Sequence, residues 1–328
     1  MDILTQMALG GAVSSQILKS ENPRRAIFLG AIIAAIPDLD MFLMFNVSDY
    51  EELILHRSFS HAVLPFLLLS FLIIFFNRYL PIVKNTSNFR LFICIFLVLL
   101  SHAFLDCLTT WGTQLFWPLD TRIATQSIYV IDLIYSFSLG SGLALLFVFQ
   151  NKNWAFKTNR WTLLLSCTYL AMLLAYQEYF KVLIREEARF DEALRVATQP
   201  VLFEPFKYRA VIEHPDTFYV SHSAISVFQT DELDYYTIPK NKYYFIEISE
   251  LIDLYPLFNL SRGYLSITKK DSNYYEINDL RYGPQNCRSE NYNSIFSYYI
   301  RVENDSVIFS QNMRTSKRLE KMMRKVFL

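Results

Sequence analysis

The sequence predicts an α-helical membrane bundle of about six helices, followed by a small, mainly antiparallel β domain. Hydrophobic residues make up 52% of the 328 residues, and the surplus lies in the first 180. The apolar segments of these 180 residues contain few ionisable residues, and those few lie within the segments or at their ends. Beyond about residue 200, aromatic and β-branched residues alternate with polar ones, which is typical of antiparallel strands.

Apolar windows define the helices that we expect in residues 1–180, the membrane domain. A helix needs roughly 20 apolar residues to span a bilayer, with about 17 as a practical minimum, so several windows are near or below the limit. Embedded polar residues and snorkelling ends lengthen them. The windows are Thr5–Leu18, Ile27–Phe45, Ala62–Phe76, Leu91–Leu108, Ile128–Phe149 and Trp161–Tyr176.

Basic residues mark alternate loops between these windows. The loops after the first, third and fifth windows carry most of them, whereas the other two short loops hold Arg57 and Arg122. The positive-inside rule places the basic loops in the cytoplasm. Six spans then place both termini, and with them the C-terminal domain, outside the plasma (inner) membrane. The basic residues are Lys19, Arg24, Arg25, Arg78, Lys84, Arg90, Lys152, Lys157 and Arg160.

Three segments are expected after the membrane domain. Residues 181–199 read as a helical stalk that ends at Gln199–Pro200, because proline cannot continue a helix. Residues 200–312 read as a β-rich soluble domain, with strands in YYFIEIS, YLSITKK, NYYEI, IFSYYIRV and DSVIFSQ. Residues 313–328 form a basic amphipathic tail, which either lies on anionic lipid or is a solvated terminal helix.

The first candidate motif is HRSFSH, which places His56 and His61 five residues apart. Such spacing suits a tight turn or a helix start, where both rings can point inward. Both are candidate metal ligands; the alternative is a pair of interfacial histidines. Arg57, between them, is a candidate for stabilising an anionic transition state.

The second motif is SHAFLDCLTTWG, in which His102 and Asp106 lie four residues apart. Residues i and i+4 share one face of a helix, so both side chains can hold one metal ion. The alternative is a hydrogen-bonded pair that ties helices together. Thr109, Thr110 and Gly112 follow and are expected to shape the rim of a pocket.

Further aspartates complete the candidate set. Asp38 and Asp40 lie in PDLD, which interrupts the second window; Asp38 is a candidate metal ligand and Asp40 a candidate general base. The alternative for PDLD is an exposed helix-end motif. Asp132 is expected either to bind metal or to interact with the dipole of a helix N-terminus. In the predicted topology, all these residues lie on the outer side of the membrane.

The donor set indicates one or two divalent metal ions. Mixed histidine and carboxylate ligands suit zinc or manganese, and such ions activate a water for hydrolysis. The sequence contains no nucleophile elbow and no phosphate-binding or dinucleotide-binding glycine motif. The net charge of zero implies no nucleic-acid partner.

The ordered motifs carry a family resemblance. MDILTQMALGGA, PDLD, HRSFSH, SHAFLDCLTTWGTQLFWP and, in the second domain, QPVLFEPFKYRAVIE and NDLRYG resemble the membrane-bound metal-dependent hydrolases, which are also described as LexA-regulated and inner-membrane-associated. The resemblance covers nearly the whole chain and implies a membrane hydrolase. One departure is at Gln6, where related sequences carry a histidine; an amide is a poor zinc ligand, so one metal position is expected to be weakened.

We therefore expect an integral membrane metal-dependent hydrolase that cleaves a phosphoester or a lipid-linked substrate through a metal-activated water. Two alternatives stay open. Intramembrane histidine and aspartate also mark divalent metal or proton transporters, although a transporter needs polar groups along the whole path. The other alternative is a non-enzymatic envelope protein with a structural or degenerate metal site.

Overall fold

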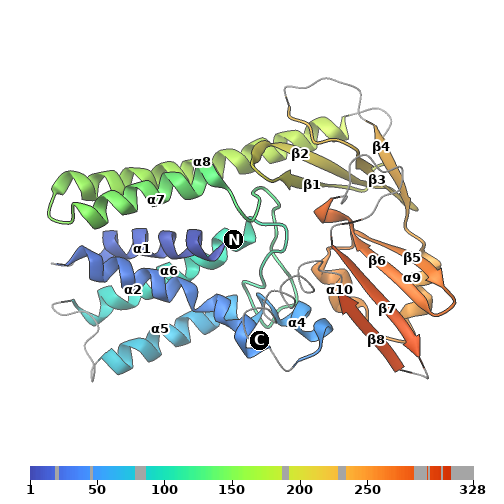
Figure 1. The fold of residues 1–328 in the computed structure, drawn as a ribbon, viewed down its shortest axis with the longest axis horizontal. Helices are drawn as coiled ribbons and strands as arrows, with labels where there is room; N and C mark the ends of the chain where they lie inside the picture. Colours follow the sequence, from blue (N-terminus) through green and yellow to red (C-terminus); the bar gives the residue numbers. More distant parts are fainter. Residues whose placement is uncertain are drawn as a thin grey trace, which may run out of the picture.

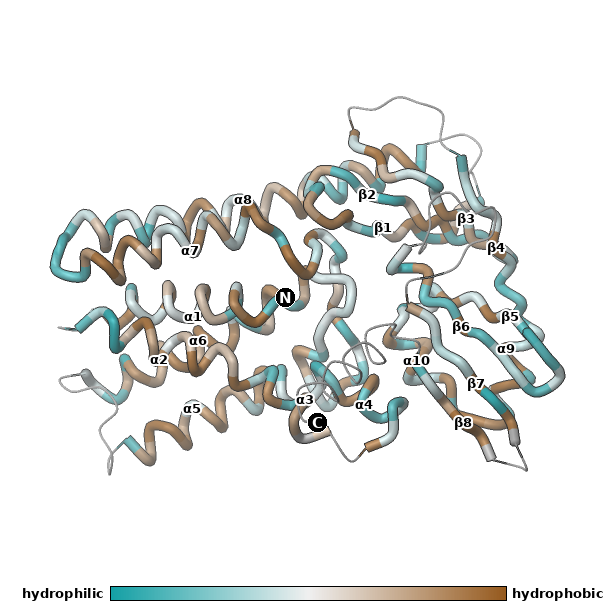
Figure 2. The backbone as a smooth tube through the Cα atoms, in the orientation of Figure 1, coloured by the Kyte–Doolittle hydropathy of each residue, from teal (hydrophilic) through white to brown (hydrophobic). Residues whose placement is uncertain are grey.

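The computed structural model describes residues 1–18, 22–44, 47–77, 86–186, 192–227, 234–283, 294, 296–303 and 306–311. Long helices lie side by side in one half of the molecule, and two antiparallel sheets form the other half (Figure 1). A layer of short helices and loops lies between them (Figure 1). The hydropathy tube shows the apolar residues concentrated along the long helices (Figure 2).

Each predicted apolar window contains a helix, but the six-span bundle is not confirmed. Among the described residues, only α6 is long and apolar enough to cross a membrane. A second span is present if the helical segments Asp49–His61 and Val63–Asn77, which meet at a bend of 56°, count together as one span. At about 1.5 Å per residue, the 16 residues of α1 reach about 24 Å, short of a hydrocarbon core of about 30 Å. The helices are α1 (Ile3–Leu18), α2 (Pro23–Ala35), α5 (Val63–Asn77), α6 (Asn88–Cys107), α7 (Leu133–Val148) and α8 (Asn153–Arg185).

Close backbone contact joins α1 to α2. A Cβ atom added at Gly10 would lie 2.3 Å from the carbonyl oxygen of Gly30, and one added at Gly30 would lie 2.1 Å from that of Gly10. Ser14 Oγ donates to the Ala26 carbonyl oxygen at 2.6 Å, which ties the helices further. Small residues permit this approach, as in many membrane helix pairs. The contact fixes α2, and therefore the PDLD segment that follows it.

The intermediate layer begins where PDLD ends the second helix. Pro37 cannot continue the α2 hydrogen-bond pattern, and the chain forms η1 (Pro37–Leu39) and α3 (Asp40–Leu43). After α4 (Asp49–Leu55), which starts with a capping box at Ser48, comes η2 (Phe59–His61). Residues 108–132 cross the same layer (Figure 1).

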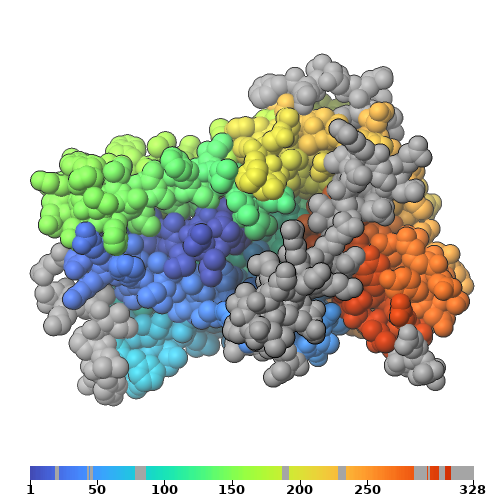
Figure 3. Space-filling model, viewed as in Figure 1, coloured from blue at the N-terminus to red at the C-terminus, as the bar shows by residue number. Residues whose placement is uncertain are grey.

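The first sheet packs against the end of α8. Its strand order is β1-β2-β3-β4, with β1 (Arg195–Val201), β2 (Glu204–Glu213), β3 (Thr217–Ser221) and β4 (Tyr235–Pro239). Phe180 and Ile184 of α8 join a buried cluster with Tyr208 and Ile212 of β2. In the space-filling view, this sheet (yellow) lies directly against the helices (green) (Figure 3). The long helix therefore links both halves rigidly.

The second sheet has the order β5-β6-β7-β8, and three short helices are associated with it. Its core includes Leu53 of α4, so the intermediate layer packs directly on this sheet. The strands are β5 (Leu265–Asp271), β6 (Tyr274–Asp279), β7 (Ser297–Glu303) and β8 (Ser306–Gln311), and the helices are α9 (Lys242–Ser249), α10 (Tyr255–Leu260) and η4 (Leu280–Tyr282).

Two expectations for the C-terminal half are wrong. YYFIEIS is not a strand but most of α9; its buried Ile248 and partly buried Tyr244 are four residues apart, and so short an apolar run fits either period. The stalk helix ends at Arg185, and Gln199–Pro200 lies in β1. Proline is tolerated there because β1 is an edge strand. The expected tail, residues 313–328, lies outside the described residues.

Candidate metal centre

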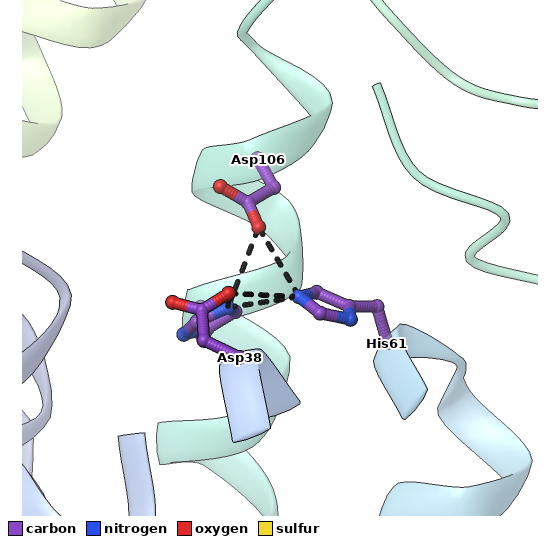
Figure 4. Close-up of side chains that lie close together, drawn as sticks. Asp38, His61 and Asp106 are labelled. Atoms are coloured by element: carbon purple, nitrogen blue, oxygen red, sulfur yellow. Dashed lines mark hydrogen bonds and ion pairs between the residues drawn. The ribbon is translucent and has the colours of Figure 1, made fainter. Parts of the chain in front are cut away.

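Three separate segments bring four of the predicted ligands together. Asp38 comes from η1, His61 ends η2, and His102 and Asp106 lie one turn apart on α6. One ligand atom from each of the four lies within 4.8 Å of all the others. The labelled side chains point toward one another from different elements (Figure 4). We call Asp38, His61, His102 and Asp106 the metal centre.

Five of the six separations between these atoms match those around a tetrahedral ion, and the sixth, between Asp38 and Asp106, is within 4.8 Å. His61 Nε2 lies 3.3 Å from Asp38 Oδ1, 3.2 Å from His102 Nε2 and 3.5 Å from Asp106 Oδ2. His102 Nε2 lies 3.5 Å from Asp38 Oδ1 and 3.3 Å from Asp106 Oδ2. Ligands about 2.0–2.1 Å from a zinc ion at tetrahedral angles are about 3.3–3.4 Å apart. The separations therefore suit four bonds to one ion.

Burial makes this group of donor atoms suited to hold a cation. His61, His102 and Asp106 are fully buried, and Asp106 Oδ2 has no hydrogen-bond partner among the described residues. Buried charges are costly unless they are paired or coordinate a metal. Two imidazole Nε2 atoms also face each other, although a neutral imidazole offers one donor at most. A divalent cation would satisfy both lone pairs and both carboxylates.

Gln6 braces Asp106. Its fully buried amide donates from Nε2 to Asp106 Oδ1 at 3.1 Å and to the His102 carbonyl oxygen at 3.3 Å. The amino group of Met1 also donates to Asp106 Oδ1. These contacts occupy one carboxylate oxygen and leave Oδ2 toward the centre. In this chain Gln6 therefore lies beside a metal ligand and orients it.

Asp40 braces His61 through a serine. Asp40 Oδ2 accepts from Ser60 Oγ at 2.6 Å and from the Arg57 backbone N–H at 3.3 Å. Ser60 Oγ lies 2.8 Å from His61 Nδ1, so this chain of contacts turns His61 Nε2 toward the centre. Asp40 Oδ1 lies 3.2 Å from His56 Nδ1. The general-base role of Asp40 stays a prediction, whereas its contacts are those of a positioning residue.

Arg57 is held beside the metal centre in a left-handed conformation, with φ of 57°. Its Nε lies 3.4 Å from Asp106 Oδ2, and Nη1 donates to Thr109 Oγ1 at 3.1 Å. The carbonyl oxygen of the next residue, Thr110, accepts a hydrogen bond from Arg281 of η4. Gly112 has φ of 74°, and a Cβ there would lie 2.6 Å from the Ile123 carbonyl oxygen. These residues shape the loop around Arg57.

Two candidate ligands lie outside the metal centre. His56 contacts Asp40, and its ring centroid is 6.1 Å from that of His61. Asp132 caps α7, because Oδ1 accepts from the Tyr135 N–H at 2.8 Å and Oδ2 accepts from Tyr169 Oη at 2.9 Å. The structure therefore gives Asp132 the helix-terminus interaction, the second of its two predicted roles.

The ion pair between Arg281 and Asp279 in the sheet domain contacts the loop at residues 108–132, which the sequence did not predict. Arg281 is 1% exposed, donates from Nε and Nη2 to both oxygens of Asp279 at 2.9 and 2.6 Å, and donates from Nη1 to the Thr110 carbonyl oxygen at 3.0 Å. Burial disfavours its charge, but the Asp279 carboxylate overrides this and raises the pKa of Arg281 above its usual value. The segment NDLRYG contains both residues, but nothing in its spacing points to the bundle.

Comparison with known proteins gives the family. A family model described as YdjM inner membrane protein matches residues 1–180, more than half of the chain. The chain belongs to this family. All four residues of the metal centre lie in the matched part, and the predicted inner-membrane location is supported.

A curated relative agrees with this assignment. Inner membrane protein YbcI of Escherichia coli (strain K12) is 29% identical over 112 residues, which are 34% of this chain and 60% of the relative. The chain thus covers less than two thirds of that protein. No solved structure matches the chain. Hydrolase activity, which the sequence resemblance implies, stays a prediction.

The bracing serine gives a direct test of the metal centre. Ser60→Ala should weaken zinc affinity by about 10- to 100-fold, because it removes the contact that orients His61. Ser101→Ala is the matched control: it removes a hydroxyl beside His102 that bonds only to the Val98 carbonyl oxygen. Competition with a metal chelator measures both. Equal affinities for the two variants would contradict the bracing role.

Proposed function

We propose that this protein is an integral membrane metal-dependent hydrolase that acts on a phosphoester or a lipid-linked substrate. The observation that carries the proposal is the convergence of four donor atoms, three of them from buried residues, at separations that suit one tetrahedral ion. A divalent ion held by Asp38, His61, His102 and Asp106 would supply Lewis acidity and a water of lowered pKa, which is the usual hydrolytic use of such ligands.

The surrounding side chains suit an anionic reaction centre. Arg57 is buried beside Asp106, and Thr109 holds its guanidinium in place. A fixed cation in a water-poor site stabilises negative charge that develops on a substrate oxygen. Asp40 and Ser60 keep His61 oriented, and Gln6 does so for Asp106. The proposal needs no nucleophilic side chain.

The position of the centre favours surface catalysis over transport. Within the described part of the chain, this is the one group of three or more histidine, cysteine or acidic residues that could hold a metal, and it lies at the sheet end of the bundle. An ion pathway needs ionisable groups along its length. The helical half beyond the centre is lined mainly by apolar residues, including Ile95, Val98 and Leu99.

Exposed aromatic side chains near the centre support a lipid-linked substrate. Phe59, two residues before His61, is 53% exposed and packs edge-on against Trp117 with ring centroids 5.0 Å apart. Phe116 and Leu119 are also more than half exposed. Aromatic residues concentrate at the level of lipid headgroups. A headgroup substrate would therefore meet the protein at this end.

A turnover assay tests the proposal. The detergent-purified, zinc- or manganese-loaded protein should hydrolyse at least one member of a panel of phosphoester lipids and soluble phosphoesters. Asp38→Asn should lower the rate by about 1,000-fold or more, because it removes a charged ligand. The Asp132→Asn variant, altered at a helix cap, serves as control and should keep most of the rate. No turnover by the metal-loaded wild type would reject the hydrolase.

The orientation with the sheets outside the cell is part of the proposal. In a Cys287→Ser background, Ser272→Cys in the β5–β6 turn should react with a membrane-impermeant maleimide in intact spheroplasts. Lys152→Cys, in the loop between α7 and α8, should react only after permeabilisation. Both positions are exposed in the fold. The reverse labelling pattern would invert the topology.

A further inference from the structure

A buried cation without a counter-ion lies between the metal centre and the second sheet. Arg122 is 6% exposed, and its Nη2 donates to the carbonyl oxygens of Ile54 at 2.6 Å and His56 at 2.9 Å. Among the described residues, its Nη1 has no hydrogen-bond partner and no carboxylate lies within ion-pair distance. An unpaired buried charge is costly, so it indicates a missing anionic partner.

Other arginines surround this group. Burial, together with the positive charges of Arg57 and Arg281, lowers the pKa of Arg122 to about 10. Asp279 neutralises Arg281. Arg57 has Asp106 beside it, but a metal ion at the centre would take up the charge of that carboxylate. With the ion bound, Arg57 and Arg122 therefore leave an excess of positive charge in a buried region.

Unpartnered phenol and indole groups lie close by. Tyr298 is fully buried. In the part of the chain that the structure describes, its hydroxyl, the hydroxyl of Tyr282 and Trp111 Nε1 have no hydrogen-bond partner. Phe296 joins them: its ring centroid is 5.6 Å from that of Trp111, 4.7 Å from that of Tyr282 and 5.7 Å from that of Tyr298. Trp111 is in turn 5.9 Å from His56. Native proteins rarely leave so many buried donors unsatisfied.

We propose that Arg122, with Arg57 and the hydroxyls of Tyr282 and Tyr298, binds a phosphate group of the substrate. This inference rests on the proposed function and deepens it. A phosphate oxyanion supplies both the missing negative charge and acceptors for hydroxyl and guanidinium donors. The two tyrosines come from the sheet domain, so that domain takes part in substrate binding. A lipid headgroup phosphate and a free phosphoester offer the same chemistry.

Titration of the full-length protein with inorganic phosphate tests the subsite, at constant ionic strength and against chloride. Arg122→Gln should weaken phosphate binding by about 10- to 100-fold, since charge-assisted hydrogen bonds are lost. The phosphate affinity of Arg122→Lys should lie between those of the wild type and Arg122→Gln. Arg262→Gln is the matched control, because Arg262 also donates to a loop carbonyl, that of Ala124, and should bind phosphate as the wild type does.

A second variant separates binding from folding. Tyr298→Phe removes a buried hydroxyl that has no partner. Without phosphate its melting temperature should equal or exceed that of the wild type, because an unsatisfied polar group is removed. Its phosphate affinity should nevertheless fall. A lower melting temperature with unchanged phosphate affinity would show a structural role and overturn the inference.

Two further arms identify the source of the phosphate and keep the two proposals apart. Nanodiscs with phosphatidic acid, compared with phosphatidylcholine alone, show whether a lipid phosphate competes with inorganic phosphate. All titrations are run with metal and after chelation, because the subsite contains no metal ligand. Equal binding by wild type and Arg122→Gln, or no binding of either phosphate by the wild type, overturns the subsite. A wild type that binds phosphate but takes up no metal in the metal-loaded arm would reject the hydrolase and leave the subsite standing.

Discussion

The packing of two carboxylates, one of them fully buried, against two buried imidazoles is the constraint on which the rest of this structure depends. Asp106 and His102 are fully buried on α6, which is the one unbroken helix among the described residues that is long and apolar enough to span a membrane. Burying such a group is costly unless its charges are paired or bind a cation and its other atoms are hydrogen-bonded. Gln6 and Ser60 meet the second condition, from α1 and from the loop before α5. The contacts between helices therefore serve the geometry of one small site.

The sheets contribute to the same geometry through the loop at residues 108–132. Arg281 bonds to the Thr110 carbonyl oxygen, and Tyr208 of the first sheet donates to the Ser127 carbonyl oxygen at 2.8 Å. Gln177 of α8 binds both Thr125 and Thr198, which joins the bundle, the loop and β1. This loop also carries Thr109, which bonds to Arg57. The loop is thus fixed from both halves of the molecule. A sheet domain that holds such a loop can influence the site without covering it.

The sequence was most informative where spacing alone determines geometry. The i, i+4 pair His102 and Asp106 had to share a helix face, and charge patterning placed Asp38 and His61 at the same end. It was less informative where long-range contacts decide. Asp132 combines a local contact, the helix cap with the Tyr135 N–H, with a long-range one, the hydroxyl of Tyr169, and neither brings it to the metal centre. The apolar run YYFIEIS is too short for its period to separate helix from strand, and the partners of Arg122 and Arg281 follow from the packing of distant segments.

The central claim is that the metal centre binds a divalent ion, and metal content tests it most directly. Elemental mass spectrometry of the detergent-purified protein compares the wild type with the double variant His102→Ala/Asp106→Ala. The account predicts near-stoichiometric zinc or manganese in the wild type and its loss in the double variant. Absence of bound metal in both proteins, even after reconstitution, would contradict the account.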